Sequence, residues 1–317
     1  MQPAQKLLQL LDSNISQAVV GKSDAVELIL NAILCQGHVL IEDVPGVGKT
    51  TLASAFAKSL ALSFKRIQFT PDITPSDVVG YTALDFKTGE MSYRPGAVFA
   101  QLVLADEINR TSPKTQSSLL EVMQERQVTI DGTTHSLPKP FVVLATQNPV
   151  DFVGTYPLPE AQLDRFFMRV SIGYPSMEEE VKVLEMYSAA DKLTDELEPV
   201  CTREDLIKLQ DMVGEVRVSK EMRVYITSIA QASRSGKLFT RGISTRGALA
   251  LMRSSQACAL LDGRDYVMPE DVRKMASPVL AHRLTLSPEA RLGAKGTTTQ
   301  KALSRLISGL QVPVRIK

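Results

Sequence analysis

The stretch of sequence that decides the fold is Asp43-Val44-Pro45-Gly46-Val47-Gly48-Lys49-Thr50. It follows the short apolar run 38–41, which is typical of a buried strand, and it precedes residues 51–57, whose pattern is typical of an amphipathic helix. Gly46 and Gly48 let the backbone turn so that successive N–H groups point inward, where the helix N-terminus adds partial positive charge. The stretch therefore predicts a strand, a phosphate-binding loop and a helix, in that order.

This loop carries the side chains that hold nucleotide phosphates and magnesium. We expect Lys49 to reach the β and γ phosphates and Thr50 to ligate Mg²⁺. The residues expected to contact the nucleotide here are Pro45, Gly46, Val47, Gly48, Lys49, Thr50 and Thr51. Asp43 stands where the common pattern G-x-x-x-x-G-K-[ST] has glycine, and a carboxylate beside polyphosphate is unfavourable unless it points away. The alternative is a glycine-rich turn with a surface lysine.

Two further apolar runs end in polar residues that suit ATP hydrolysis. The run 101–105 leads to Asp106 and Glu107, as a Walker B strand does. Asp106 would hold magnesium through its water shell, and Glu107 would orient and polarise the attacking water. The run 141–146 leads to Asn148, whose amide can sense the γ-phosphate, although an Asn-Pro pair also favours a turn. A single run of this kind is often an ordinary strand, but after a phosphate loop we favour the catalytic interpretation.

Two arginines complete the set at expected element boundaries. Arg165 follows the segment 158–164, and Arg246 opens a helix that continues through Leu249 and Met252. A guanidinium placed against the γ-phosphate stabilises charge that develops as the bond to the leaving group breaks. On spacing alone, each arginine is more often a surface salt-bridge residue.

Together these motifs resemble the MoxR family of AAA+ ATPases across nearly the whole chain. The matching segments are Val19-Val20-Gly21, Glu42 with the phosphate loop, Ala105-Asp106-Glu107-Ile108-Asn109-Arg110, Ala145-Thr146-Gln147-Asn148-Pro149 and residues 154–166. The resemblance implies an α/β fold: an AAA+ P-loop NTPase domain with a parallel sheet flanked by helices, then a small all-α lid domain. It also implies ATP and Mg²⁺ at the site. Glu-Asp before Val-Pro-Gly is frequent in the family, so Asp43 is interpreted as a family trait.

The same resemblance assigns individual roles. Asn148 matches sensor 1, Arg165 matches the arginine finger that acts on a neighbouring subunit, and Arg246 matches sensor 2. Val20 and Gly21 match the segment that packs against adenine. Which subunit's site each arginine serves depends on the assembly and stays open at this point.

The chain changes character near residues 173–175, where we place a hinge between a nucleotide-binding domain, 1–174, and a helical lid, 175–317. Before the hinge, strand-like runs alternate with helical stretches, which is typical of a parallel sheet covered on both faces. These runs are 38–42, 64–69, 101–105, 141–146 and 166–172. After it, helix starts are expected at Ser176, Thr202 and Pro269.

Two segments inside the first domain alternate like β-hairpins. One is 81–93, around Thr88-Gly89, and the other is 127–141, around the strong turn signal Asp131-Gly132. The family resemblance makes them the helix-2 insert and the pre-sensor-1 hairpin, which project toward a ring pore or a bound client. They could instead only extend the sheet edge.

Composition agrees with these predictions. With 317 residues, 44% hydrophobic and 22% charged, the chain is long enough for two domains. The net charge of +1 gives no reason to expect nucleic acid or an anionic membrane as a partner. Cys35, Cys201 and Cys258 are scattered, which favours buried thiols in a reducing compartment. The sequence shows neither a leader nor a run of membrane-spanning length, so we expect a cytoplasmic protein without membrane insertion.

The sequence thus predicts an ATP-hydrolysing protein, and the resemblance implies its use. It implies a ring, with a hexamer expected, that remodels or matures partner proteins, typically ones with a von Willebrand factor A domain, including insertion of metal cofactors. Two alternatives are the ATPase subunit of a magnesium- or cobalt-chelatase-like complex and a nucleotide-gated scaffold with little turnover. The intact set of acids, amide and arginines speaks against the scaffold. A DNA motor is a weaker option because the charge is balanced.

Overall fold

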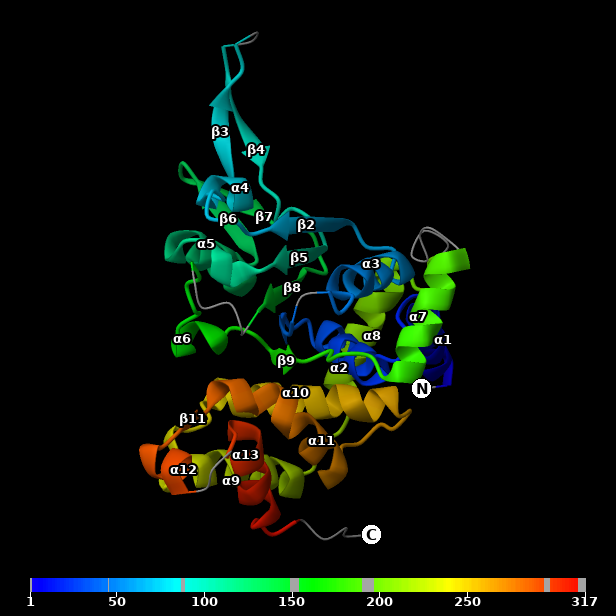
Figure 1. The fold of residues 1–317 in the computed structure, drawn as a ribbon, viewed down its shortest axis with the longest axis vertical. Helices are drawn as coiled ribbons and strands as arrows, with labels where there is room; N and C mark the ends of the chain where they lie inside the picture. The colour runs from blue at the N-terminus through cyan, green and yellow to red at the C-terminus, as the bar shows by residue number, and fades with distance from the viewer. Residues whose placement is uncertain are drawn as a thin grey trace.

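A five-stranded parallel sheet forms the centre of the protein (Figure 1). The computed structural model describes residues 2–44, 46–86, 89–148, 154–189, 197–293 and 297–312. The strands are β1 (Val39–Glu42), β2 (Phe64–Gln68), β5 (Leu102–Asp106), β8 (Val142–Gln147) and β9 (Met168–Val170), in the order β2-β5-β8-β1-β9. Each lies within one of the predicted runs or differs from it by one residue at an end. The predicted α/β class is confirmed.

Both faces of the central strands β1, β5 and β8 are buried, because their residues alternate between two apolar clusters. Val39, Leu104 and Leu144 pack with α1 (Gln2–Ala18), α2 (Ser23–Leu34) and α3 (Lys49–Ser59). Their sequence neighbours Leu40, Val103 and Val143 pack with α5 (Pro113–Glu125) on the other face. Strands buried on both sides have to be apolar at every position, which is why short apolar runs located them.

The remainder of the chain is mainly helical. It contains α7 (Met177–Ala189), α8 (Arg203–Glu215), α9 (Lys220–Ser235), α10 (Thr245–Leu261), α11 (Pro269–Leu280), η2 (Ala281–Arg283), α12 (Pro288–Gly293) and α13 (Thr299–Ser308). The three predicted helix starts are confirmed; Thr202 and Asp205, for example, form a reciprocal capping box. From here on, the word lid refers to α9 to α13, which form only part of the region 175–317 that is predicted as a helical lid. It lies below β9 in Figure 1, and α11 packs against β9.

The lid contains one element that an all-helical prediction does not include. Strands β10 (Phe239–Arg241) and β11 (Thr285–Leu286) pair antiparallel, with Phe239 opposite Leu286. Both of these side chains are buried in the same apolar cluster as the lid helices. The pair therefore joins the segment that follows α9 to the segment that follows η2.

Both predicted hairpins are present. Strands β3 (Gly80–Leu84) and β4 (Met91–Pro95) follow the short helix α4 (Pro75–Val79) and project away from the body of the molecule (Figure 1). The expected turn residue Thr88 lies outside the described residues. Strands β6 (Gln127–Ile130) and β7 (Thr133–Ser136) form the other hairpin.

The second hairpin is shorter than the expected 127–141, because Pro138 and Pro140 have no N–H with which to extend the ladder. Its turn residues Asp131 and Gly132 have φ of 49° and 78°, as an Asp-Gly turn of this type requires. The two hairpins touch through Tyr93 and His135, whose rings stack with centroids 3.9 Å apart. The hairpins are thus neighbours rather than independent arms.

Two buried histidines make the fold sensitive to acid. His38, just before β1, accepts a hydrogen bond from Val143 N at 3.0 Å through Nδ1 and donates through Nε2 to Met123 O at 2.8 Å. Burial lowers its pKa from 6.5 to about 4. Burial, followed by the positive charge of Arg283, lowers the pKa of His282 to about 3. Both rings are therefore neutral in the folded protein at pH 7.

We expect the free energy of unfolding to fall as the pH drops from 7 to 5. Because both folded pKa values lie below the unfolded value of 6.5, the stability contribution is complete above pH 6.5 and is lost as the pH falls toward the folded pKa values. The loss at pH 5 should be about 2 kcal/mol for each histidine. Urea unfolding at the two pH values measures it. In His38→Gln the pH dependence should fall by about half; an unchanged dependence would exclude His38 as a source.

Candidate nucleotide-binding site

The phosphate loop has the geometry that its sequence predicts. Gly46 and Gly48 have φ of 85° and 86°, and a Cβ at either position would meet no atom within 4 Å. Glycine is therefore needed for the backbone conformation, and the space beside the loop is open. Lys49 and Thr50 begin α3 directly after Gly48, and Thr50 is exposed in its first turn. Pro45 lies outside the described residues.

The side chain of Lys49 lies among three acids. Its ammonium donates to Asp43 O at 2.8 Å. Burial lowers the pKa of Lys49, and the carboxylates of Asp106, Asp43 and Glu107 act in the opposite direction. The loop lysine and the acids at the end of β5 are thus brought together, as predicted.

Thr146 links the two acids at the end of β5. Its hydroxyl donates to Asp106 Oδ1 at 2.6 Å and accepts from Glu107 N at 2.8 Å. Glu107 has φ 58° and ψ 49°, a left-handed conformation that costs a non-glycine residue about 1–2 kcal/mol. Such strain persists only where surrounding contacts enforce it, and it is concentrated at functional sites. The Thr146 hydroxyl supplies one of those contacts.

The carboxylate of Glu107 is held on its outer side. Gln68 Nε2 donates to its Oε2 at 3.0 Å, and Arg110 Nε lies 3.3 Å from the same oxygen. Glu107 is partly exposed, so its carboxylate can be reached from solvent. Both partners bind Oε2, so the other carboxylate oxygen, Oε1, is the one that a water next to Glu107 would contact.

The residues present fit a magnesium ion. The hydroxyl of Thr50 and the carboxylate of Asp106 are hard oxygen donors of the kind that Mg²⁺ prefers, and Thr146 fixes the orientation of Asp106. The other oxygen of Asp106 accepts from Arg66 Nη2 at 2.6 Å, and the same nitrogen donates to Gln68 Oε1. Arg66 and a metal ion would therefore compete for the free lone pairs of Asp106.

The carboxylate of Asp43 is bound on both oxygens: Oδ1 accepts from Val44 N at 3.0 Å, and Oδ2 is directed toward the linker that precedes α7. Its Oδ2 accepts from Ile172 N at 2.5 Å, Gly173 N at 2.6 Å and Ser171 Oγ at 3.1 Å. From the other side, Lys22 Nζ donates to Ile172 O at 3.3 Å and Gly173 O at 2.9 Å. We call the set Lys22, Asp43 and 171–173 the linker clamp.

The linker clamp also places the segment expected to pack against adenine. Val20 and Gly21 directly precede Lys22, in the connection between α1 and α2. Gly21 has φ +70°, and a Cβ there would lie 2.0 Å from Glu179 Cδ in the first turn of α7. The segment 20–22, the loop start at Asp43 and the linker to α7 thus lie together.

Asn148 follows β8 directly and is buried. Its backbone carbonyl accepts from Asn109 Nδ2 at 3.3 Å, just beyond the acids of β5. Because β5 and β8 are parallel neighbours, Asn148 emerges at the same sheet edge as Asp106 and Glu107. This is the placement that the sequence predicts.

Arg246 belongs to the lid, and Arg165 lies in a segment that the lid residue Arg283 contacts. Arg165 is half-buried between α6 (Glu160–Leu163) and β9. Arg246 is exposed in the first turn of α10. Arg283 connects them: it pairs with Asp164 at 2.5 Å, and the charges of Arg246 and Arg241 contribute, after burial, to lowering its pKa.

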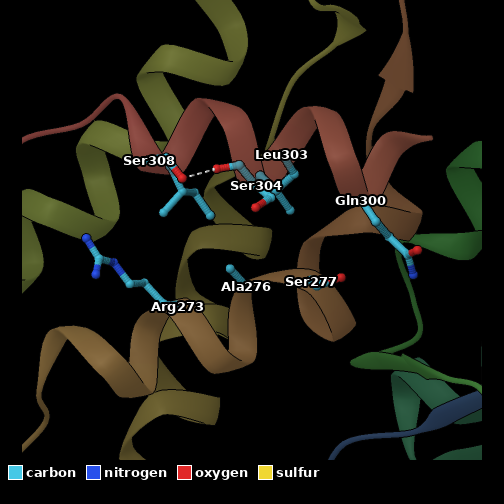
Figure 2. A pocket seen from close by; sticks show the side chains of 8 residues that line it. Arg273, Ala276, Ser277, Gln300, Leu303, Ser304 and Ser308 are labelled. Atoms are coloured by element: carbon cyan, nitrogen blue, oxygen red, sulfur yellow. Dashed lines mark hydrogen bonds between the residues drawn. The ribbon is translucent and has the colours of Figure 1, made fainter. Parts of the chain in front are cut away.

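A separate cavity of about 340 Å³ lies between α11 and α13, away from the strand ends (Figure 2). Arg273 and Gln300 point to opposite ends of it, and the Ser308 hydroxyl donates to Ser304 O. Its polar groups therefore do not converge on one point, as a phosphate site would require.

Several side chains of the site have no assigned role in the motifs that the sequence displays. Arg66 and Gln68 alternate with the buried Ile67 on β2, which marks them as a polar face beside the Walker B strand. Thr146 directly precedes the quoted Gln147-Asn148 pair. Lys22 follows the Val20-Gly21 segment. The available signal was that each of these residues lies next to a motif or a predicted strand. Their hydrogen-bond partners could not be seen in the sequence, because those partners lie on other helices, strands or loops.

The sheet order, the phosphate loop and the lid define an ATPase of the AAA type. Residues 38–168 match the model of the "ATPase family associated with various cellular activities (AAA)", and residues 231–305 match that of the AAA lid domain. A crystal structure of a Cytophaga hutchinsonii protein assigned as an ATPase has a TM-score of 0.91 and 36% identity, covering 99% of this chain and 97% of that one.

Individual relatives narrow the class. Chaperone MoxR1 of Mycobacterium tuberculosis is 37% identical over 308 residues, which cover 94% of this chain and 80% of that protein. The uncharacterized protein YeaC of Bacillus subtilis is 50% identical, with 95% and 93% covered. Magnesium-chelatase subunit ChlI-2 of Arabidopsis thaliana is more distant, at 26% identity over 67% of this chain. The chain belongs to the MoxR family of AAA+ ATPases. None of the described helices is both long enough and apolar enough to cross a bilayer.

Proposed function

We propose that this protein binds ATP with Mg²⁺ at the phosphate loop and hydrolyses it by attack of water on the γ-phosphate. The observation that carries the proposal is the hydroxyl of Thr146, which holds Asp106 and the strained Glu107 together beside Lys49. Lys49 neutralises phosphate charge, Thr50 and Asp106 hold the metal, and Asn148 helps position the water. Glu107 takes its proton. Bound Mg²⁺ adds electrostatic stabilisation of the phosphate oxygens.

We further propose that nucleotide lies between a domain of residues 1–174 and one of residues 175–317, and that Val20 and Gly21 pack against the adenine. Residues Gly46 to Thr51, with Pro45, cradle the phosphates. Arg165 then acts on the site of a neighbouring subunit in a ring, with a hexamer expected. Arg246 acts on bound nucleotide as sensor 2.

The work done with this ATP is proposed to be remodelling or maturation of partner proteins in the cytoplasm. The relatives named MoxR and chaperone MoxR1 support this use. We propose clients with a von Willebrand factor A domain, including insertion of their metal cofactors, and we assign the two hairpins to client coupling. The exposed Phe86 and Met91 near the end of the first hairpin suit such contacts.

Steady-state ATPase activity across protein concentrations, with particle mass measured in parallel, tests the ring. Because the finger comes from a neighbour, specific activity should rise with the assembled fraction. Hydrolysis by a monomer at a concentration-independent rate would overturn the proposal. For the client, a hydrolysis-deficient form should retain a von Willebrand-type partner; copurification of a tetrapyrrole-binding subunit would favour the chelatase alternative instead.

A further inference from the structure

One lid arginine is bound to the segment that carries Arg165. Arg283 Nη1 donates to Asp164 O at 3.1 Å and to Asp164 Oδ1 at 2.5 Å. Its Nη2 donates to Phe166 O at 2.7 Å and to Phe167 O at 3.3 Å. The bonds therefore fall on both sides of Arg165 in the sequence. We call residues 164–167 the finger segment.

These contacts join the lid and the finger segment firmly. The side chain of Arg283 is only 3% exposed, and Nε donates to Val279 O at 2.9 Å in α11. All five N–H donors of the guanidinium are thus used, which leaves it one orientation. His282 adds a bond from Nε2 to Phe166 O at 3.2 Å. Separating the lid from the finger segment would leave a buried charge without its partner, which is strongly unfavourable.

The side chain of Arg165 itself is not part of this network. Its backbone N–H donates to Gln162 O, and within the residues that the structure describes its guanidinium has no hydrogen bond or ion pair. The side chain is half-buried. The backbone of Arg165 is therefore fixed from both sides by lid contacts, while its charged group is available to another molecule.

We propose that Arg283 is a positioning residue that couples the lid of one subunit to the arginine finger that this subunit presents to its neighbour. The proposal rests on the proposed function, in which Arg165 acts in trans and nucleotide binds between the two domains. The segment is also tied to the sheet, because Phe167 N donates to His38 O at 2.8 Å. A shift of the lid on nucleotide binding would therefore reach residues 164–166 through the bonds of Arg283. Nucleotide binding at one site would thereby change the position of Arg165 at the next site around the ring.

The test is complementation between two slow variants. Arg283→Lys keeps the charge but cannot make the same set of bonds, so the finger is misplaced, and we expect a ten- to hundredfold loss of kcat with little change in KM. Glu107→Gln subunits are hydrolysis-deficient but carry an intact Arg283. The two variants are mixed below the concentration at which subunits assemble, and the mixture is then concentrated. Its ATPase activity should exceed that of either variant alone, because Arg283→Lys subunits receive a correctly placed Arg165 from a Glu107→Gln neighbour.

Two controls separate this inference from its premise. Arg165→Ala mixed with Glu107→Gln should also complement; if it does not, the trans finger itself is wrong. If Arg165→Ala complements and Arg283→Lys does not, the proposed coupling through Arg283 is wrong, while the proposal that Arg165 acts in trans is retained. Arg264→Lys is the matched structural control, because Arg264 forms a comparable lid ion pair with Asp271 at 2.6 Å without touching the finger segment. It should lower the unfolding temperature without producing complementation.

A double variant and an isosteric one complete the design. Arg165→Ala/Arg283→Lys should turn over no more slowly than Arg165→Ala alone, since Arg283 acts only through Arg165; a further tenfold loss would mean a general structural role. If Arg283→Lys does not fold, Asp164→Asn weakens the same contact from the other side and should complement in the same way. A folded Asp164→Asn with wild-type kcat would overturn the proposal.

Discussion

Glu107→Gln should bind ATP as tightly as the wild type and turn it over about 10²- to 10⁴-fold more slowly. The amide keeps the size of the side chain and an acceptor for Gln68 and Arg110, but it cannot take a proton from water. Loss of a general base typically costs a factor of this size. Titration with a fluorescent nucleotide measures binding, and single-turnover hydrolysis measures the chemical step.

Glu121→Gln is the matched control for this variant, because Glu121 lies exposed on α5 and takes no part in the site. Its turnover should equal that of the wild type. Wild-type turnover by Glu107→Gln would show that another group activates the water. Loss of ATP binding in Glu107→Gln would instead mean that Glu107 shapes the nucleotide pocket.

Asp43→Ala should lower the free energy of unfolding by about 3 kcal/mol, because it removes a buried, hydrogen-bonded carboxylate. The N–H groups of Ile172 and Gly173 lose their acceptor. We also expect ATP affinity to fall, because the backbone carbonyl of residue 43, which alanine keeps and which holds Lys49, would lose its anchoring to the linker. Urea unfolding and nucleotide titration measure the two effects.

Asp72→Ala serves as the control for a lost acid, because Asp72 is exposed beyond β2. Its stability should stay within about 0.5 kcal/mol of the wild type. If Asp43→Ala unfolds at the same urea concentration as Asp72→Ala, the linker clamp contributes nothing to stability. If only stability falls and ATP affinity does not, the clamp acts on the linker alone.

The parts of the fold that follow from local pattern could be predicted from the sequence. Strand runs such as 141–146 are apolar because both faces of the sheet are covered, and Gly46 and Gly48 mark a loop that needs left-handed backbone. Asp131-Gly132 and Thr202 with Asp205 likewise carry their structure within a few residues.

The contacts that complete the site could not be predicted in this way. Asp43 binds Ile172, which is 129 residues away, and Arg283 binds Asp164, which is 119 residues away. Only the packing of the lid and the linker brings these pairs together. The pairing of Arg66 with Asp106 depends in turn on the sheet order, which puts β2 beside β5. For that reason the charge of Asp43 was visible in the sequence, but the direction of its side chain was not.

The stacking of Tyr93 on His135 has a mechanical consequence. The β6–β7 hairpin follows α5 through Arg126 alone, and α5 begins shortly after η1 (Ile108–Arg110), whose N-cap is Glu107. A load applied to the tip of the β3–β4 hairpin is therefore shared with the second hairpin and reaches the strained Glu107 along one short, stiff helix. In this arrangement the projecting arm is connected, through Tyr93, His135 and α5, to the residue proposed to activate water.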